Sequence, residues 1–114
     1  MSKRDDIILL EDIIESIEKI NEYTHGLTLE NFLADRKTKD AVARNFEIMG
    51  EATARMNNQF KTIHTQIDWK DLKDLRNVFI HSYEIIDYSL IWDIIIKELP
   101  PVYEKLKDLL ITLK

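Results

Sequence analysis

Apolar residues recur at steps of three and four along most of this chain, the spacing that places them on one face of an α-helix. Near the N-terminus this stripe comprises Ile7, Leu10, Ile14, Ile17 and Ile20. Asp5 and Asp6 precede the stripe and are expected to cap the start of the helix. Gly26 marks its expected end.

A second stripe predicts the best-defined helix of the chain. Its members step by 4, 3, 4, 3 and 4 and are Val42, Phe46, Met49, Thr53, Met56 and Phe60. This spacing suits a helix that lies lengthwise against a partner helix. The helix is expected to begin between Thr38 and Asp40 and to fray from Asn57-Asn58. Thr28 is expected to cap a short segment that connects the two helices.

The C-terminal half predicts further helices. Asp68 is the expected N-cap of a helix from Trp69 to the early eighties, and Asp87 caps one from Tyr88 to about Leu99. Pro100-Pro101 should stop that helix, with Pro101 in the first turn of a last one. The chain is therefore expected to be all-α, an antiparallel, up-and-down bundle of four or five helices.

Composition narrows the class of protein. At 114 residues the chain is expected to form a single domain over residues 1–114. No cysteine is present, which excludes disulfides and thiolate metal sites and suits a reducing compartment. The N-terminus lacks the apolar core of a signal peptide, and the densest apolar run, 90–96, is interrupted by Asp93. We expect a cytoplasmic protein with no membrane partner.

Charge is distributed unevenly along the chain. The net charge is −5, which argues against broad coating of nucleic acid and against DNA as a partner. Residues 1–30 carry three bases and eight acids, whereas residues 31–64 carry six bases and four acids. Any polyanion is expected to bind near this middle segment and Arg76, away from the first helix.

Residues 76–83 concentrate the candidate chemistry, because Arg76, Asn77, His81 and Tyr83 fall within one short stretch. On a helical wheel with about 100° per residue, Arg76, Asn77 and His81 face away from the core side marked by Leu72, Leu75, Phe79, Ser82 and Ile86. Arg76 and His81 are separated by about 140° on the same wheel, which makes one chain a poor catalyst.

Trp69 and Ile80 fall in the same outward sector of the wheel. Large apolar side chains beside outward polar ones indicate a second buried surface. We therefore expect a homodimer that brings two copies of Arg76 and His81 to one cleft.

No metal and no cofactor are expected. Glu22 and His25 match one half of the Glu-x-x-His pattern of di-iron bundles, which require two such motifs, and His64 stands alone in an expected loop. The chain also lacks a glycine-rich phosphate loop, so it is not expected to be a nucleotidyltransferase itself.

The segment Arg76-Asn77-x-x-x-His81-x-Tyr83 resembles the Arg-x4-His-x-Tyr signature of the HepT-like toxins in the HEPN superfamily of helical ribonucleases. The similarity extends from Asp40 to Pro100. Its further elements are Asp40-x-Ala-Val-Ala-Arg44, Glu47-Ile-Met-Gly50-Glu51-Ala52, Ile67-x-Trp69, Asp87, Ile91-Trp92 and Leu99-Pro100.

This resemblance implies a HEPN-like fold and a metal-independent endoribonuclease that acts on single-stranded RNA, with its site formed across a homodimer. It also implies a partner, a minimal nucleotidyltransferase antitoxin that transfers AMP to the motif tyrosine, here Tyr83. In such a toxin–antitoxin pair the modification silences the toxin.

The residue types suit that chemistry. RNA cleavage without a metal requires removal of a 2′-hydroxyl proton and protonation of the leaving oxygen, and His81 titrates in the right range to act as general base or acid. The forked donors of Arg76 match phosphate oxygens and stabilise developing charge. Asn77 is expected to orient His81 or a phosphate oxygen.

The same residues could also have purely structural roles. Arg76 and His81 can form a structural pair, and Tyr83 can be an ordinary packing residue. Glu51 is expected to be a buried partner of Arg44 rather than a site residue. The alternative function is a non-catalytic helical subunit that binds a nucleotide and a nucleotidyltransferase partner, which the overall acidity favours slightly. A purely structural dimerisation module leaves the outward polar residues unexplained.

Overall fold

The structure, a computed structural model, describes residues 3–77 and 86–114. In these ranges the chain forms helices and no strand. The elements are α1 (Lys3–Thr24), α2 (Leu29–Ala34), α3 (Arg36–Arg55), α4 (Asn58–Ile63), α5 (Trp69–Asp74), α7 (Tyr88–Asp93), the π-helical segment η1 (Ile94–Glu98) and α8 (Leu99–Leu113).

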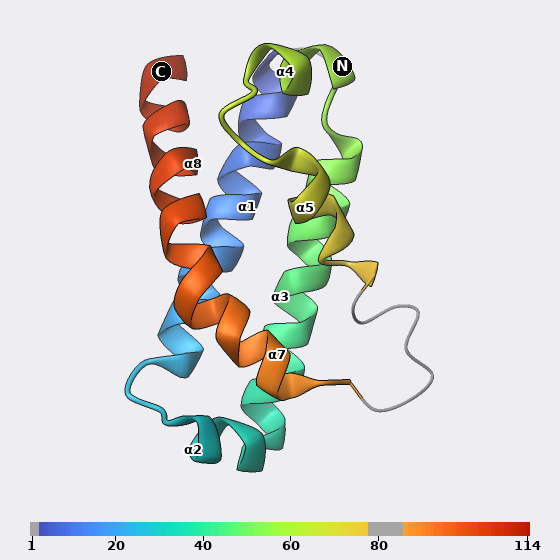
Figure 1. The fold of residues 1–114 in the computed structure, drawn as a ribbon. Helices are drawn as coiled ribbons and strands as arrows, with labels where there is room; N and C mark the ends of the chain where they lie inside the picture. Colours follow the sequence, from blue (N-terminus) through green and yellow to red (C-terminus); the bar gives the residue numbers. More distant parts are fainter. Residues whose placement is uncertain (1–2, 78–85) are drawn as a thin grey trace.

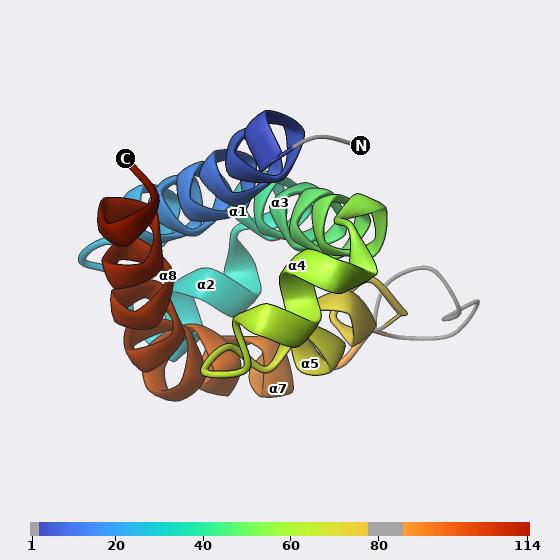
Figure 2. The ribbon, with the colours of Figure 1, turned by 90° about the horizontal axis from the view of Figure 1, so that it is seen from above.

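The long elements run antiparallel to their neighbours in sequence. In Figure 1, α1 descends to the short helix α2, α3 ascends to α4, α5 descends again, and α7, η1 and α8 ascend to the C-terminus. Seen from above, these elements surround a common interior (Figure 2). The predicted all-α, up-and-down bundle is confirmed. The single domain over residues 1–114 stays a prediction.

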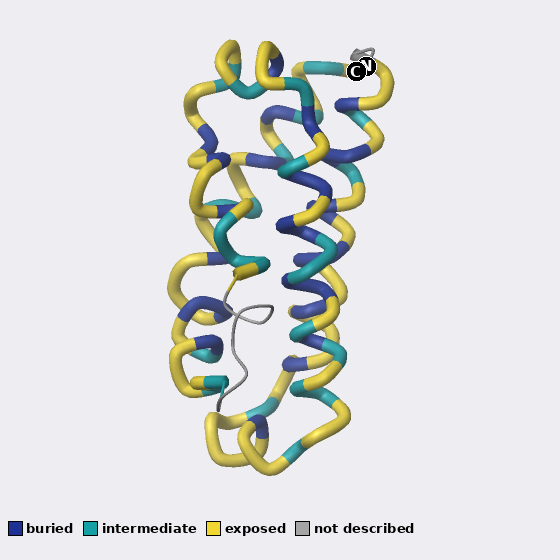
Figure 3. The backbone as a smooth tube through the Cα atoms, turned by 90° about the vertical axis from the view of Figure 1, so that its right-hand side faces the viewer, coloured by how far each residue is buried: buried dark blue, intermediate teal, exposed yellow. Residues whose placement is uncertain are grey.

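Both predicted apolar stripes face the interior. Figure 3 shows the buried positions of the long helices on their inner sides. The largest fully buried side chains are Phe32, Phe46, Leu10, Ile13, Ile17, Ile20, Met49, Ile91, Leu99 and Leu106. Helix α1 packs mainly against α3 and also contacts α8. Burial of each of these side chains contributes about 1.5–3 kcal/mol to stability.

Helix α2 closes one end of the bundle through aromatic contacts. The Phe32 ring lies 5.1 Å from the ring of Trp92 and 6.1 Å from that of Tyr88, centroid to centroid. The ammonium of Lys39 lies 5.0 Å from the centre of the Tyr88 ring. These contacts hold the start of α7 in place. Helix α7 is the next described element after the candidate segment, residues 76–83.

Side-chain caps start the short helices where the sequence predicted them. Thr28 accepts a hydrogen bond from the backbone N–H of Asn31 at 3.1 Å. Asp68 accepts one from Asp71 N–H, and Asp87 one from Leu90 N–H, each at 3.1 Å. These contacts satisfy backbone donors that the first turn of a helix otherwise leaves without partners.

Other predicted boundaries were wrong by a few residues. Helix α1 already includes Lys3, so Asp5 and Asp6 lie in its first turn rather than capping it. Helix α3 begins at Arg36, because Asp35 accepts hydrogen bonds from the Thr38 N–H at 3.0 Å and the Thr38 hydroxyl at 2.7 Å.

The region predicted as a fraying helix end and a loop contains a further helix. Helix α3 ends at Arg55, and Asn57 caps α4 by accepting a hydrogen bond from the Gln59 N–H at 2.9 Å. Phe60 therefore lies in the core, 7 % exposed, from α4 rather than from α3. The buried carboxylate of Asp6 accepts the Asn57 N–H at 3.0 Å and attaches this turn to α1.

Pro100-Pro101 does not separate two helices by a loop. The chain passes from α7 through η1 directly into α8, where the prolines occupy the first turn. Because proline has no N–H to donate, the preceding turn loses regular bonds and widens, and the Leu99 N–H bonds to the Ile94 carbonyl five residues back. Within the described residues, none of the helices has both the length and the apolar character needed to cross a membrane.

Candidate functional site

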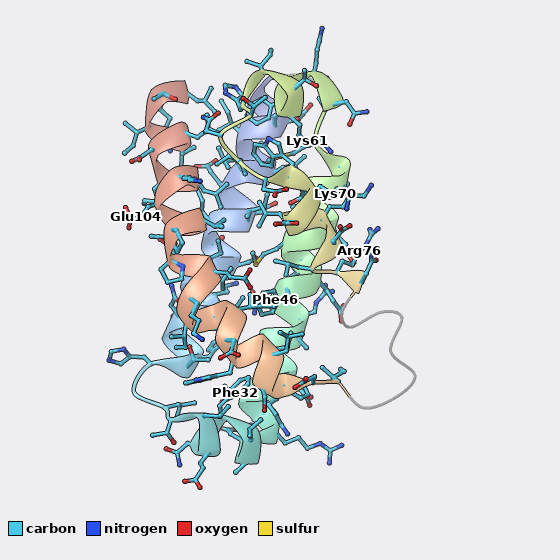
Figure 4. The ribbon with its side chains drawn as sticks, in the orientation of Figure 1. Phe32, Phe46, Lys61, Lys70, Arg76 and Glu104 are labelled. Carbon is cyan, nitrogen blue, oxygen red and sulfur yellow. The ribbon has the colours of Figure 1, made fainter. Side chains whose placement is uncertain are left out.

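The candidate segment leaves the bundle directly after α5. Leu72 is buried and Leu75 is partly buried against the core, whereas Arg76 is half-buried and Asn77 is exposed. Figure 4 shows the Arg76 side chain directed away from the bundle. For these residues the predicted division into core and outward faces is confirmed.

The remaining predicted site residues lie outside the described part of the chain. His81 and Tyr83 belong to residues 78–85, as do Phe79, Ile80 and Ser82 of the predicted wheel. Their assignments as general base or acid and as modification site stay predictions. Helix α5 ends at Asp74 and residues 75–76 form a turn, so the predicted unbroken helix from Trp69 to the early eighties was wrong.

Gly50 of α3 allows the backbone before Arg76 to lie directly on that helix. A Cβ atom added at Gly50 would overlap the Cβ of Arg76, and would lie 3.0 Å from the Arg76 backbone nitrogen and 3.1 Å from the Lys73 carbonyl oxygen. Such distances are too short for any residue with a side chain. Gly50 therefore positions the turn from which the Arg76 guanidinium projects.

Asp68 and Asp71 lie close together at the start of α5. On a helical wheel Asp71 lies about 160° from Lys73, and the carboxylate of Asp74 pairs with Lys70 at 3.1 Å. The Asp68 carboxylate raises the pKa of Asp71 through a hydrogen bond and through its negative charge. Both aspartates line a cavity of about 330 Å³ between α5, η1 and α8. An anionic ligand is therefore expected on the Arg76 side and not at this cavity.

A further cation near this surface is Lys61 of α4. Its ammonium donates a hydrogen bond to the Thr53 carbonyl at 3.1 Å. Burial lowers the pKa of Lys61, the positive charge of Lys73 lowers it further, and the Asp6 carboxylate acts in the opposite direction. Lys61 and Lys73 therefore face the same region of the surface. The sequence analysis missed Lys61, because α4 was expected to be a loop.

The expected outward position of Trp69 was wrong. Trp69 is 8 % exposed, lies 6.0 Å from Phe60 between ring centroids, and donates its indole N–H to the His64 carbonyl at 2.9 Å. It is the first residue of α5, where α4 and the following loop fold over the end of the bundle. A wheel built on α5 alone does not include this cover. Trp69 therefore gives no support to a dimer surface.

The expected pair of Glu51 and Arg44 was also wrong. Glu51 is exposed, and Arg44 instead lies 3.6 Å from the carboxylate of Glu47, one turn away on α3. A partner three residues away on the same helix face is closer than one two turns away. In the ranges 3–77 and 86–114, no cluster of three or more His, Asp or Glu residues could hold a metal ion.

The described helices form an all-α, up-and-down bundle, which is consistent with the HEPN-like class. The family model described as "Ribonuclease HepT-like" matches residues 13–109. The chain therefore belongs to the HepT-like ribonuclease family.

Individual relatives agree with this assignment. The chain is 39 % identical over 100 residues to "Probable ribonuclease HepT" of Thermococcus cleftensis, covering 88 % of this chain and 91 % of that protein. It is 36 % identical over 110 residues to a Methanocaldococcus jannaschii protein named "Putative RNase", covering 96 % and 91 % of the two chains. A second such protein of that organism is 36 % identical over 107 residues, covering 94 % and 98 %. No solved structure matches this chain.

Proposed function

We propose that this chain is a metal-independent endoribonuclease that cleaves single-stranded RNA and serves as the toxin of a toxin–antitoxin pair. The observation that carries the proposal is family membership over residues 13–109, a range that includes Arg76 and His81 in the Arg-x4-His-x-Tyr arrangement. The names of the relatives, which describe ribonucleases, support it.

The outward position of Arg76 supports a role in phosphate binding. Within the described ranges, no carboxylate lies within ion-pair distance of its guanidinium, whose forked donors match the oxygens of a phosphate. In the proposed reaction Arg76 stabilises the negative charge that develops on the phosphorus centre. His81 removes the proton of the 2′-hydroxyl or protonates the leaving 5′-oxygen, and Asn77 orients one of these groups.

The proposed site is the cleft of a homodimer. A two-fold axis beside the segment would supply a second copy of Arg76 and His81, one histidine neutral and the other protonated. The wheel that separated Arg76 and His81 by about 140° assumed one unbroken helix, and α5 ends at Asp74. With Trp69 in the core as well, this proposal rests on the family.

The proposed activity is tested by incubating the protein with single-stranded RNA in excess EDTA. Cleavage is expected to persist, because the proton transfers and charge stabilisation come from side chains. The same oligonucleotide with 2′-O-methyl groups should remain intact, since it lacks the attacking hydroxyl. Activity that disappears with EDTA and returns with a divalent metal would reject the metal-independent mechanism.

Regulation is proposed to occur at Tyr83, through AMP transfer by a minimal nucleotidyltransferase antitoxin. AMP adds bulk and a negative phosphate beside the site, which repels and blocks RNA. The intact mass of the protein, measured after incubation with the antitoxin and ATP, is expected to rise in AMP-sized steps. The Tyr83→Phe protein should show no increase. An unchanged mass for the native protein, or an equal increase for the variant, would exclude this site.

The competing function is a non-catalytic subunit that binds a nucleotide and a nucleotidyltransferase. The net charge of −5 favours it, because an acidic protein attracts RNA weakly. A folded protein that binds the nucleotidyltransferase but cleaves no RNA under any metal condition would establish this alternative.

A further inference from the structure

Three cations follow one side of the bundle, from α4 to the end of α5. Lys61 belongs to α4, Lys73 to α5, and Arg76 follows directly after α5. Figure 4 shows Lys61 near the α4 end and Arg76 further down the α5 side. We call Lys61, Lys73 and Arg76 the basic row.

Helix α3 fixes the positions of all three residues. The Lys61 ammonium bonds to the Thr53 carbonyl of α3 at 3.1 Å, and one turn earlier Gly50 lies against the backbone of Lys73 and Arg76. Residues three apart on a helix are neighbours, so adjacent turns of α3 contact the Lys61 ammonium and the backbone of Lys73 and Arg76. Lys73 lies in the last turn of α5, and Arg76 lies just beyond the end of that helix.

The basic row forms no salt bridge in the described part of the protein. The ion pairs of the structure involve other bases, namely Lys19, Arg44, Lys70, Lys97 and Lys114. The Asp6 carboxylate is the acid that offsets Lys61, and it accepts the Asn57 N–H. Each lysine ammonium has three donors, and the Thr53 carbonyl uses one of those of Lys61. Within the described residues, two donors of the Lys61 ammonium thus remain for a ligand.

From this arrangement we infer that Lys61 and Lys73 bind successive phosphates of a single-stranded RNA whose scissile phosphate lies at Arg76. The inference deepens the proposed ribonuclease function and rests on it for the position of the cleaved bond. Phosphodiester backbones carry regularly spaced negative charges, which a line of cations complements. The carboxylates of Asp68 and Asp71 disfavour a phosphate at the cavity that they line.

The test measures binding of an uncleavable 2′-O-methyl RNA strand by fluorescence anisotropy over a range of salt concentrations. Lys61→Gln and Lys73→Gln are each expected to reduce the slope of log affinity against log salt by about 0.7, which corresponds to about fivefold weaker binding at about 0.1 M salt. Lys19→Gln is the matched control. It removes the same charge from α1, where Lys19 lies 3.2 Å from Glu15, and should leave the slope unchanged.

Two further variants separate charge from folding. Lys61 is half-buried, so Lys61→Arg tests whether a retained charge restores the slope if Lys61→Gln is unstable. Lys73 is exposed, so Lys73→Gln is expected to fold normally and to give the result independently. A single-stranded DNA of the same sequence distinguishes an RNA site from a general phosphate site.

The outcomes separate this inference from the proposed activity. Slopes equal to the native value in both lysine variants, or changes confined to DNA, would overturn the basic row as an RNA site. Reduced slopes in a protein that cleaves no RNA would support the row and reject the ribonuclease.

Discussion

Replacing His81 by alanine is expected to lower the rate of RNA cleavage by on the order of a hundredfold or more, because a general acid or base contributes about 10²–10⁴-fold. Arg76→Ala should produce a loss of similar size, on the order of 10²–10³-fold, since one donor to developing charge is removed. Initial rates on a labelled RNA strand in EDTA measure both effects. Removing both residues should cost less than the product of the single losses, because groups that act on one transition state are not additive.

Two arginine variants control for charge and for folding. Arg76→Lys should recover little of the rate, since a lysine presents a point charge without the forked donors. Arg44→Ala is the matched control, because Arg44 is an exposed arginine of α3 paired with Glu47, and it should retain full activity. Circular dichroism and thermal unfolding establish that each variant is folded. Native rates in folded His81→Ala protein would contradict the assignment of His81.

The sequence was most informative where local chemistry determines local structure. The stripe of α1, the part of the second stripe from Val42 to Thr53, and the caps at Thr28, Asp68 and Asp87 depend on residues within a few positions of one another, and these were predicted correctly. Contacts between distant segments were not predicted. Trp69 is buried by α4, and Pro100-Pro101 is accommodated by the wider turn of η1, so both outcomes depended on neighbouring elements.

Some residues of the candidate site could be predicted from the sequence, and others could not. Periodicity alone placed Leu72 in the core and left Arg76 and Asn77 outside it, and the structure shows Leu72 buried, Arg76 half-buried and Asn77 exposed. It gave no role to Gly50 or Lys61, because their contacts join α3 to α5 and α4 to α3. A glycine in the interior of a predicted helix was the available signal, since helices disfavour glycine unless a close approach requires it.

Gly50→Ala is expected to destabilise the protein by about 1–3 kcal/mol, the usual cost of inserting a methyl group where no space exists. Helix propensity alone predicts the opposite, a stabilisation by about 1 kcal/mol. The sign of the change therefore reports whether α3 and the Arg76 turn are in contact. The free energy of unfolding, measured by urea denaturation, decides between these results. Glu51→Ala, at the neighbouring exposed position of α3, should change stability by less than about 0.5 kcal/mol.

Combining Gly50→Ala with Arg76→Gly tests the contact directly. The added methyl group overlaps the Cβ of Arg76, so removing that Cβ should make Gly50→Ala less destabilising than it is in the native background. The rescue should be partial, because the Arg76 nitrogen and the Lys73 carbonyl remain within 3.0 and 3.1 Å of the new atom. In the single variant the displaced turn should also reduce RNA cleavage, since Arg76 no longer projects from its native position. Equal destabilisation in both backgrounds would show that Gly50 does not act through the Arg76 side chain.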